Sequence, residues 1–402
     1  MKEAGNLVKY ILKRLFQSLL TVLLVVCVVF VLMRMMPKEY FFTEDELMKF
    51  TDQQKYSKLE AQGIMDICSR CHGNGLLEDG SACPDCMTYS TNPNQGTGYV
   101  DRPVLVQLGD FFSSMFEMRV FNAKGKEVKS IVPVSLWQWL GDRENAFGEL
   151  KEGYRPRLCF NLGKSIRLEK GQYVTDVIAV KMSVSMSIGL VSLAISLVLG
   201  VVLGVLQARY KDGLFDHVGT GYTVLVNAVP HLVIYTIIMI AGASIFGLPM
   251  RYDATAAEPW RTMVLPVVCL SIGSIAGYML WTRRYMVDEL NKDYIRLAKL
   301  KGLSDRKVMF RHVLKNAFVP LAQYLPYSIL LTVGGSLLVE RFFAVPGMGP
   351  ELTNAISRYD LNLVQGIVLL YATMGILGVF LGDLLMTIID PRIKLTGKGD
   401  VR

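Results

Sequence analysis

Long uncharged apolar stretches constrain this chain more than any other feature of its sequence. Six stretches lack Asp, Glu, Lys and Arg and are each long enough for a helix to cross a bilayer, which takes about 20 residues. The 402-residue chain is 51% hydrophobic and only 19% charged, which is too little charge to cover a soluble fold of this size. We therefore predict transmembrane helices within residues 15–33, 182–207, 218–250, 262–282, 317–339 and 361–382.

The distribution of basic residues predicts how these helices are oriented. Residues 283–315 hold ten Lys and Arg against four Asp and Glu, whereas residues 251–261 are balanced. Loops rich in Lys and Arg stay in the cytoplasm. We therefore expect both chain ends to be cytoplasmic and residues 37–178 to be extracytoplasmic. The net charge of +8 follows this loop pattern, so nucleic acid is not an expected partner.

The first apolar stretch is predicted to stay in the protein as an anchor. A secretory signal has a shorter apolar core and ends at small residues. This stretch instead runs to Met33 and is followed by Arg-Met-Met-Pro. Residues 1–36 are therefore expected to form a cytoplasmic segment and the first transmembrane helix.

Two CxxC pairs are the most specific feature of the extracytoplasmic segment. They are separated by eleven residues and lie within residues 68–86. Two such turns can present four thiolates to one Zn²⁺ ion, and a site with four thiolates has no position for a catalytic water. The sequence thus favours a structural zinc site formed by Cys68, Cys71, Cys83 and Cys86.

The first pair continues as CxxCxGxG and is similar to one repeat of the zinc region of DnaJ-type chaperones. The second pair is an imperfect copy, because its glycines, Gly96 and Gly98, follow only later. Three alternatives remain open. The oxidising compartment permits two disulfides, the string from Cys68 to His72 is formally the CxxCH attachment sequence of c-type haem, and an iron–sulfur cluster also uses thiolates. The alternative function is therefore a membrane-anchored extracytoplasmic redox, haem or metal-binding protein.

A basic segment, residues 286–318, stands out among the predicted cytoplasmic loops. It predicts two short helices joined at Gly302, which suits the left-handed conformation that ends a helix, with Ser304 as a cap for the second helix. Each helix also has an apolar stripe: Ile295 and Ala298 on the first, and Met309, Val313 and Ala317 on the second. One exposed stripe is basic and consists of Lys292, Arg296 and Lys299. Such a helix could fill a groove on a partner protein or lie on anionic lipid.

Three motifs follow one another in the second half of the chain. The first is an alanine, a glycine four residues later and an "RHxLxNAxxP" string, formed by Ala298, Gly302, Arg311, His312, Leu314, Asn316, Ala317 and Pro320. The second, "VERFFAVPGMGPELTNAISRYDLNLVQG", begins at Val339 and includes Glu340, Phe343, Pro346, Gly347, Gly349, Asp360 and Gly366. The third, "GDLLMTIIDPRI", contains Asp383, Asp390, Pro391 and Arg392. A weaker match, "FNLGKSI", precedes the second span. Over residues 1–36 and 160–394 the chain resembles the B-type permeases of ATP-binding-cassette importers for oligopeptides and dipeptides, which have a MetI-like transmembrane domain. Arg296 replaces the glutamate of the general permease motif, as is usual in the peptide branch.

This resemblance implies a mechanism and a set of partners. Such a permease pairs with a homologous second permease and two cytoplasmic ATPases, and an extracytoplasmic solute-binding protein delivers a peptide or similar small solute. ATP binding drives the two permeases between inward- and outward-facing states. The loop that would couple the permease to an ATPase contains Tyr294, Arg296, Ala298, Lys299, Gly302, Leu303 and Ser304.

The chain itself is not expected to be an enzyme. It contains no P-loop, no GxSxG and no HExxH string, so ATP hydrolysis is assigned to the partner subunits. His231, inside the third apolar stretch, is a candidate for the solute path, because polar groups inside membranes are often functional.

The predicted fold is an all-α polytopic membrane protein of about six transmembrane helices, with a small α+β insert between helices 1 and 2. Its expected parts are residues 1–36, the insert 37–178, the permease core 179–390 and a cytoplasmic tail 391–402.

Overall fold

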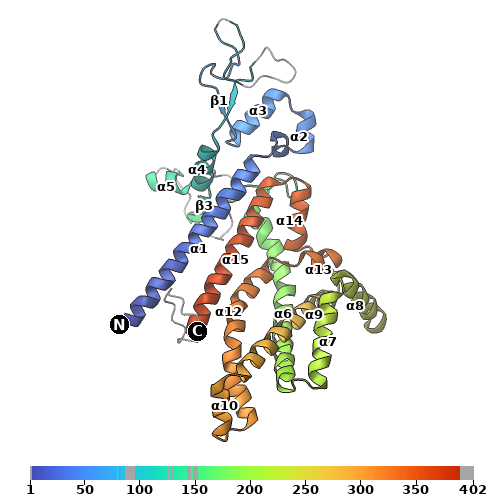
Figure 1. Cartoon of the computed structure of the whole chain (residues 1–402). Helices are drawn as coiled ribbons and strands as arrows, with labels where there is room; N and C mark the ends of the chain where they lie inside the picture. Colours follow the sequence, from blue (N-terminus) through green and yellow to red (C-terminus); the bar gives the residue numbers. More distant parts are fainter. Residues whose placement is uncertain are drawn as a thin grey trace. The chain divides into compact units, whose positions relative to one another are not determined.

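The protein is mostly helical in its computed structural model (Figure 1). The structure describes residues 2–78, 80–86, 96–122, 124, 127–128, 131–142, 146–147 and 153–389. The predicted tail 391–402 and the last residues of the third motif, from Asp390, lie outside this part of the chain. In chain order the elements are α1 (Lys2–Arg34), the 3₁₀ helix η1 (Lys38–Phe41), α2 (Glu44–Lys49), α3 (Asp52–Ala61), β1 (Met65–Ile67), β2 (Tyr99–Asp101), α4 (Val104–Ser114), β3 (Phe116–Phe121), β4 (Val134–Ser135), α5 (Leu136–Gly141), β5 (Arg155–Phe160), α6 (Val174–Arg209), α7 (Leu214–Ala228), α8 (His231–Phe246), α9 (Pro259–Leu290), α10 (Asp293–Leu300), α11 (Asp305–Val308), the π-helical turn η2 (Met309–Val313), α12 (Leu314–Val333), α13 (Leu337–Phe342), α14 (Met348–Ser357) and α15 (Leu361–Ile389).

Five helical stretches in the described part of the chain are long and apolar enough to cross a membrane, and α7 with α8 makes a sixth if that pair is one span. This confirms the predicted polytopic bundle. The third predicted span is broken, because α7 and α8 meet at an angle of 108°. Val229 between them is extended, with ψ of 133°. Pro230 explains the break, since proline lacks an N–H and disfavours a helical conformation in the residue before it.

The chain folds into two compact units, and each is discontinuous in sequence. Unit 1 comprises residues 1–23, 178–353 and 369–402, and unit 2 comprises residues 24–177 and 354–368. The domain boundaries expected from the sequence follow the order of the chain instead, and they stay a prediction.

In unit 1, small residues bring α6 and α9 into close contact. A side chain at Gly200 would collide with Tyr278, and one at Gly204 would collide with Thr282. GxxxG spacing allows such close approach of helices in lipid. Gly277 on α9 behaves differently, because the space beside it is open and belongs to a cavity.

Unit 2 contains the predicted α+β insert. Strands β1 and β2 pair antiparallel, and a second antiparallel sheet has the order β4-β3-β5. Helices α2 and α3 begin with capping boxes, in which Thr43 pairs with Glu46 and Thr51 with Gln54. These pairs satisfy backbone N–H groups that the first turn of a helix leaves free.

One buried carboxylate, that of Asp360, joins two distant parts of unit 2. It accepts hydrogen bonds from the Ser165 hydroxyl at 2.5 Å and from the backbone N–H groups of Arg167 and Leu168, both at 2.9 Å. Asp360 is fully buried, and Ser165 precedes it by 195 residues. The weak "FNLGKSI" match and the second motif therefore meet at this side chain.

Replacing Asp360 tests how much this junction contributes to stability. Asp360→Ala leaves a buried hydroxyl and buried N–H groups without an acceptor, so we expect a loss of about 3 kcal/mol or more. Thermal unfolding in detergent should show a midpoint several degrees lower. The matched control is Asp45→Ala, which removes an exposed carboxylate 3.4 Å from Lys170 and should shift the midpoint little. Equal shifts for the two variants would contradict this role of Asp360.

Candidate functional site

Unit 1 contains a cavity of about 1080 Å³ between α6, α9, α12 and the segment leading into α13. Its wall combines hydroxyl and aromatic side chains with aliphatic ones, and Glu340 is the only acidic or basic residue among the described lining residues. The polar and aromatic lining comprises Ser185, Ser192, Ser274, Tyr278, Trp281, Tyr285, Gln323, Tyr324, Tyr327, Ser328, Thr332, Ser336 and Glu340. Such a wall can hydrogen-bond a ligand without imposing a fixed charge.

Glu340 is part of the wall's support, because both its carboxylate oxygens accept backbone hydrogen bonds. Oε1 accepts from the N–H of Ser336 and Oε2 from the N–H of Gly349, each at 3.0 Å. A side chain at Gly335 or Gly347 would collide with this carboxylate. Glu340 is buried and therefore holds α13 and the start of α14 together beside the cavity.

His231, the residue predicted to line a solute path, is not among the described lining residues of the cavity. It is exposed as the first residue of α8. Its Nε2 is 3.6 Å from the position that a Cβ at Gly273 would take. Its place in a solute path stays a prediction.

The basic segment forms two short helices with a turn at Gly302, as the sequence predicts. Gly302 has φ of +78°, and α11 then runs through a π-helical turn into α12. The Ser304 carbonyl accepts a hydrogen bond from Val308 N–H at 3.0 Å, whereas its hydroxyl makes no capping bond. The residues of both apolar stripes are buried and form one cluster with residues of α6 and α9. The cluster consists of Val205, Ala208, Met286, Ile295, Ala298, Val308, Met309, Val313 and Ala317.

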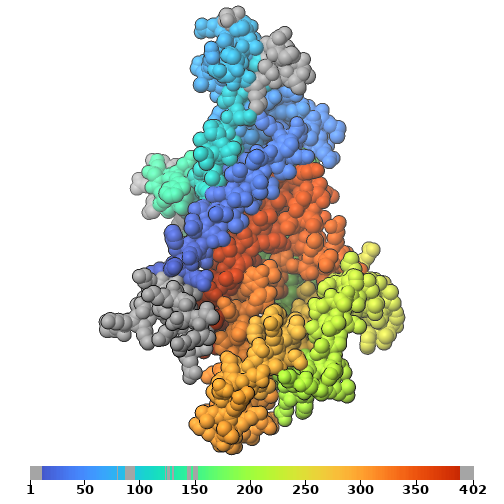
Figure 2. All heavy atoms as spheres, in the orientation of Figure 1, coloured from blue at the N-terminus to red at the C-terminus, as the bar shows by residue number. Residues whose placement is uncertain are grey.

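The outer surface of this segment is both basic and apolar. Figure 2 shows the atoms of α10 and α11, in orange, at one end of unit 1. The side chain of Arg296 is 74% exposed and that of Lys299 is 55% exposed. Leu297 and Leu300 are also exposed, the latter by 85%. Sequence reasoning noted the basic stripe and missed these two leucines, although they are three residues apart and so share one side of the helix.

A polar triangle joins α10 to two long helices. The Tyr294 hydroxyl donates to Glu289 Oε1 at the end of α9. Asn316 of α12 donates to the Tyr294 oxygen at 2.7 Å and to Glu289 Oε1 at 3.2 Å. Burial and then the hydrogen bond to Glu289 raise the pKa of Tyr294 to about 12, which keeps the phenol neutral and able to donate. Sequence reasoning noted Tyr294 and Asn316 separately and had no means to bring them together.

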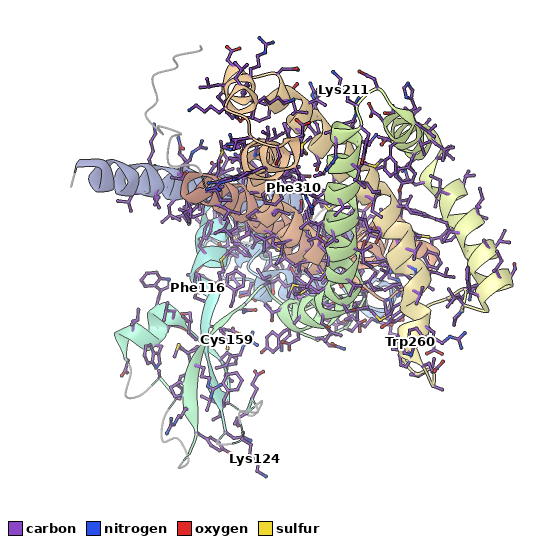
Figure 3. The ribbon with its side chains drawn as sticks, turned by 90° about the horizontal axis from the view of Figure 1, so that it is seen from below. Phe116, Lys124, Cys159, Lys211, Trp260 and Phe310 are labelled. Atoms are coloured by element: carbon purple, nitrogen blue, oxygen red, sulfur yellow. The ribbon has the colours of Figure 1, made fainter. Side chains whose placement is uncertain are left out.

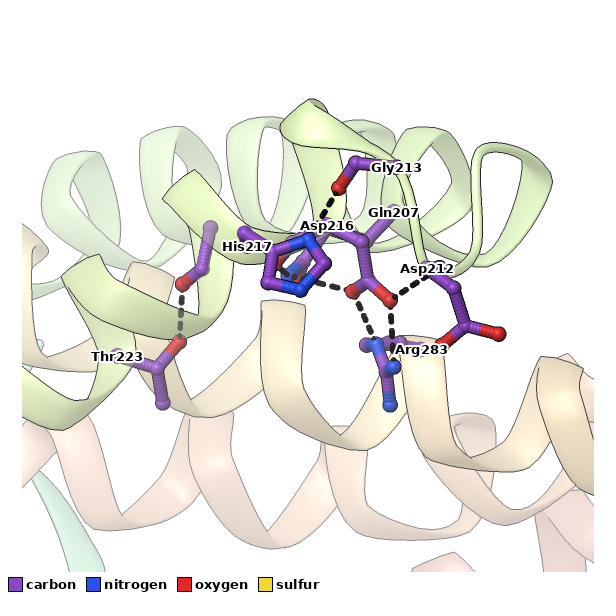
Figure 4. A network of polar contacts seen from close by, with 8 residues as sticks. Gln207, Asp212, Gly213, Asp216, His217, Thr223 and Arg283 are labelled. Carbon is purple, nitrogen blue, oxygen red and sulfur yellow. Dashed lines mark hydrogen bonds and ion pairs between the residues drawn. The ribbon is translucent and has the colours of Figure 1, made fainter.

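A second polar network joins α6, α7 and α9 (Figure 4). The Asp216 carboxylate receives two hydrogen bonds from the Arg283 guanidinium, at 2.5 and 2.7 Å. The side-chain amide of Gln207 donates to the Asp216 carbonyl at 3.1 Å, and the Asp212 N–H donates to Asp216 Oδ2 at 3.0 Å. A bidentate pair of this kind fixes both distance and direction. It therefore holds the turn between α6 and α7 against α9.

In unit 2 the four predicted metal ligands converge. All four sulfurs lie within 4.8 Å of one another, with 3.9 Å between those of Cys68 and Cys83 and 3.2 Å between those of Cys71 and Cys86. Zinc bonds to sulfur at about 2.3 Å, which places tetrahedral sulfurs about 3.8 Å apart. A disulfide requires about 2.05 Å, and all four cysteines are free and buried. The cluster has the donor atoms and spacing of a metal site.

Gly96 and Gly98 pack beside the cysteine cluster although they lie ten and twelve positions after Cys86. The Gly98 carbonyl accepts from Cys68 N–H at 2.8 Å, and the Gly75 carbonyl accepts from Gly96 N–H at 3.1 Å. A side chain at Gly98 would collide with the Gly73 carbonyl. The pair Gly73 and Gly75 thus packs against the pair Gly96 and Gly98. The sequence does not reveal this contact, because residues 87–95 separate the second pair from its cysteines.

Backbone hydrogen bonds also tune one thiol of the cluster. Burial raises the pKa of Cys71, but hydrogen bonds from Cys86 and from the backbone of Gly75 and Gly73 outweigh burial and lower it to about 7. The Gly75 N–H donates to Cys71 Sγ at 3.3 Å. A lowered thiol pKa favours the thiolate, which is the form that binds metals.

Comparison with known proteins assigns the family. Residues 200–395 match the family described as "Binding-protein-dependent transport system inner membrane component". A Brucella abortus protein named as a peptide transport system permease is 30% identical over 297 residues, which are 73% of this chain and 89% of that protein. The chain belongs to this family.

Two further relatives match over a shorter region. The oligopeptide transport system permease protein AmiC of Streptococcus pneumoniae is 40% identical over 192 residues, 48% of this chain. The dipeptide transport system permease protein DppB of Bacillus subtilis is 34% identical over 194 residues, also 48% of this chain. The matched regions span only 38% and 62% of these two relatives.

As a member of this transport family, the chain is a multi-pass membrane protein. Residues 200–395, which match the family, contain the loop of α10 and α11, most of the cavity wall and Glu340. The four cysteines lie outside that region. Family membership gives the helical bundle a role of its own, so we do not keep the alternative in which it only anchors a redox centre.

Replacing Tyr294 by phenylalanine tests the polar triangle. Tyr294→Phe removes one hydroxyl and should loosen α10 by about 1–2 kcal/mol, seen as faster hydrogen–deuterium exchange in residues 293–300. Because folding raises the pKa of Tyr294 from 10.0 to about 12, its contribution is complete below pH 10 and is lost as the pH rises through 12. Tyr210→Phe, on an exposed ring, is the control. Unchanged exchange in Tyr294→Phe would contradict the role of the hydroxyl.

Proposed function

We propose that the chain is one permease subunit of an ATP-binding-cassette importer for peptides or similar small solutes. The observation that carries this proposal is the cavity in unit 1, whose wall combines hydroxyl, aromatic and aliphatic side chains and whose only carboxylate among the described lining residues accepts backbone N–H groups. Peptides share main-chain hydrogen-bonding groups and differ in their side chains, so a wall without a free charge can accept many of them. The names of the relatives point to the same class of solute.

The proposal includes four kinds of partner. A homologous second permease supplies the other half of the path, two ATPases hydrolyse ATP, and a solute-binding protein delivers the cargo. The loop of α10 and α11 docks on an ATPase through its exposed basic and apolar surface. Buried Ile295 and Ala298 transmit its movement to α6 and α9, against which they pack.

The proposed topology follows from the charge of the loops. The basic segment 286–318 and both chain ends are cytoplasmic, and residues 37–178 are extracytoplasmic. The insert is then on the side where the solute-binding protein meets the permease.

The cysteine cluster is proposed to hold one structural Zn²⁺ ion. The four free thiols and the spacing of their sulfurs support zinc over two disulfides. The bound ion would cross-link a segment that contributes few apolar side chains to a core.

Transport by the reconstituted complex tests the assignment of the coupling loop. A side chain at Gly302 would meet no atom of this chain within 4 Å, so a large one would project toward whatever docks there. Gly302→Trp should reduce solute uptake at least tenfold and abolish the stimulation of ATP hydrolysis by loaded binding protein. Gly302→Asn is the control, because asparagine tolerates the left-handed backbone. Uptake and stimulation that survive in Gly302→Trp would overturn the coupling role, and a wild-type complex that moves no peptide would overturn the function.

Metal analysis of the purified chain tests the zinc site. We expect one zinc per chain, and Cys71→Ser should lose it because a hydroxyl does not replace a thiolate on zinc. Cys159→Ser, also in the insert and away from the cluster, should keep the metal. Purified protein without zinc whose four thiols react only after reduction would favour disulfides instead.

A further inference from the structure

Unit 2 exposes an apolar patch on α4, α5 and the sheet β4-β3-β5. Helix α5 packs on β3, β4 and α4, so these elements form one subdomain. Leu105 is 81% exposed and Trp137 65% exposed. The patch consists of Leu105, Phe116, Val132, Trp137, Leu140 and Leu158. Several large exposed apolar side chains on one subdomain are a feature of interaction surfaces.

The strand pairing shows that one face of the sheet consists of apolar side chains. Leu158 pairs with Met118, and Phe116 pairs with Phe160, with ring centroids 5.5 Å apart. The opposite face is already covered, because Arg119 on that face bonds Glu117 and lies 3.6 Å from the centre of the Tyr173 ring. Alternate residues of a strand point to opposite faces. On the apolar face Met118 and Val120 are buried, and the large side chains that stay exposed are Phe116, Leu158 and Phe160.

The patch begins close to the end of a transmembrane helix. Phe111 near the end of α4 packs on Phe30 of α1, with ring centroids 5.1 Å apart. Phe30 lies four residues before Arg34, which is about 6 Å along the helix axis. Phe116 follows Phe111 by five positions, a reach of at most about 17 Å. Figure 3 shows Phe116 at the α5 end of the strand pair and Lys124 at its far end.

We propose that this patch lies in the lipid interface at the C-terminal end of α1, as a second membrane contact of the insert. Its depth is set by the contact between Phe111 and Phe30. Trp137 and Leu140, three residues apart on α5, face outward together, and tryptophan is enriched where membranes meet water. Helix α5 carries no charged side chain, so none has to be removed from water where the helix enters the interface. This inference requires α1 to be a transmembrane helix and does not rest on the transported solute.

Lipid quenching of Trp137 fluorescence tests the proposal in the full chain. Trp139→Phe, Trp260→Phe and Trp281→Phe leave Trp137 as the only tryptophan of the chain. The protein is reconstituted in vesicles of three parts phosphatidylcholine to one part phosphatidylglycerol. Replacing part of the phosphatidylcholine by a form brominated near the head group should reduce Trp137 emission roughly twofold, since bromine quenches only at contact depth. Iodide in the water should quench it weakly.

A matched control places the only tryptophan on α2. In the same background, Trp137→Phe with Met48→Trp uses a position that is 81% exposed and outside the patch. Its emission should respond to iodide and ignore brominated lipid. If Trp137 behaves in the same way, the proposal is wrong. It is also wrong if Trp137 is shielded from both quenchers only when the other subunits or the binding protein are present, because a protein would then cover the patch.

A second measurement uses the unmodified chain and so does not depend on the folding of the variants. A phosphatidylcholine with a photoreactive group near its head group should label residues 131–142 as well as α1. Labelling of α1 without labelling of residues 131–142 would overturn the proposal.

Discussion

Inside a bilayer every backbone N–H and C=O needs a partner within the protein, and one non-helical stretch of this chain depends on Glu340 for it. Residues 334–347 join α12, α13 and α14 and leave helical geometry twice. Glu340 accepts the N–H groups of Ser336 and Gly349 on either side of α13. Irregular backbone at membrane depth is tolerated only where protein covers it or a cavity receives it, and here both conditions hold. The cavity wall therefore depends on this buried carboxylate.

Two polar networks of unit 1 fix directions that apolar packing leaves free. One joins α10 to α9 and α12, and the other joins α6 and α7 to α9. Packing supplies most of the attraction, since Ile295 and Val308 are almost completely buried. Apolar contacts have little directionality, whereas the triangle of Glu289, Tyr294 and Asn316 fixes direction. The pair of Asp216 and Arg283 fixes α9 against α7 in the same way. A push on α10 thus reaches α9 and α12 through defined atoms.

Much of this architecture could be predicted from the sequence, and the remainder required three dimensions. Apolar runs and loop charges predicted the helical bundle, because membranes impose length and charge rules that act locally. The turn at Gly302 and the cysteine cluster also follow from local rules. The cavity could not be predicted in this way, because the spacing of two glycines does not show what they face. Gly200 and Gly204 face another helix, whereas Gly277, which follows Gly273 at the same spacing, faces open space. The contacts of Asp360 with residues 165–168 join segments whose pairing no periodicity encodes.

The contact between Asp360 and residues 165–168 can form only late in the synthesis of the chain. Residues 24–177 leave the ribosome long before residues 354–368, yet both belong to unit 2. At a synthesis rate of about 5–20 residues per second, the 195 residues between Ser165 and Asp360 take about 10–40 seconds. During that interval the hydrogen bonds that Asp360 accepts from Ser165, Arg167 and Leu168 cannot form. The insert therefore lacks its contacts with Asp360 until nearly the whole helical bundle has been synthesised.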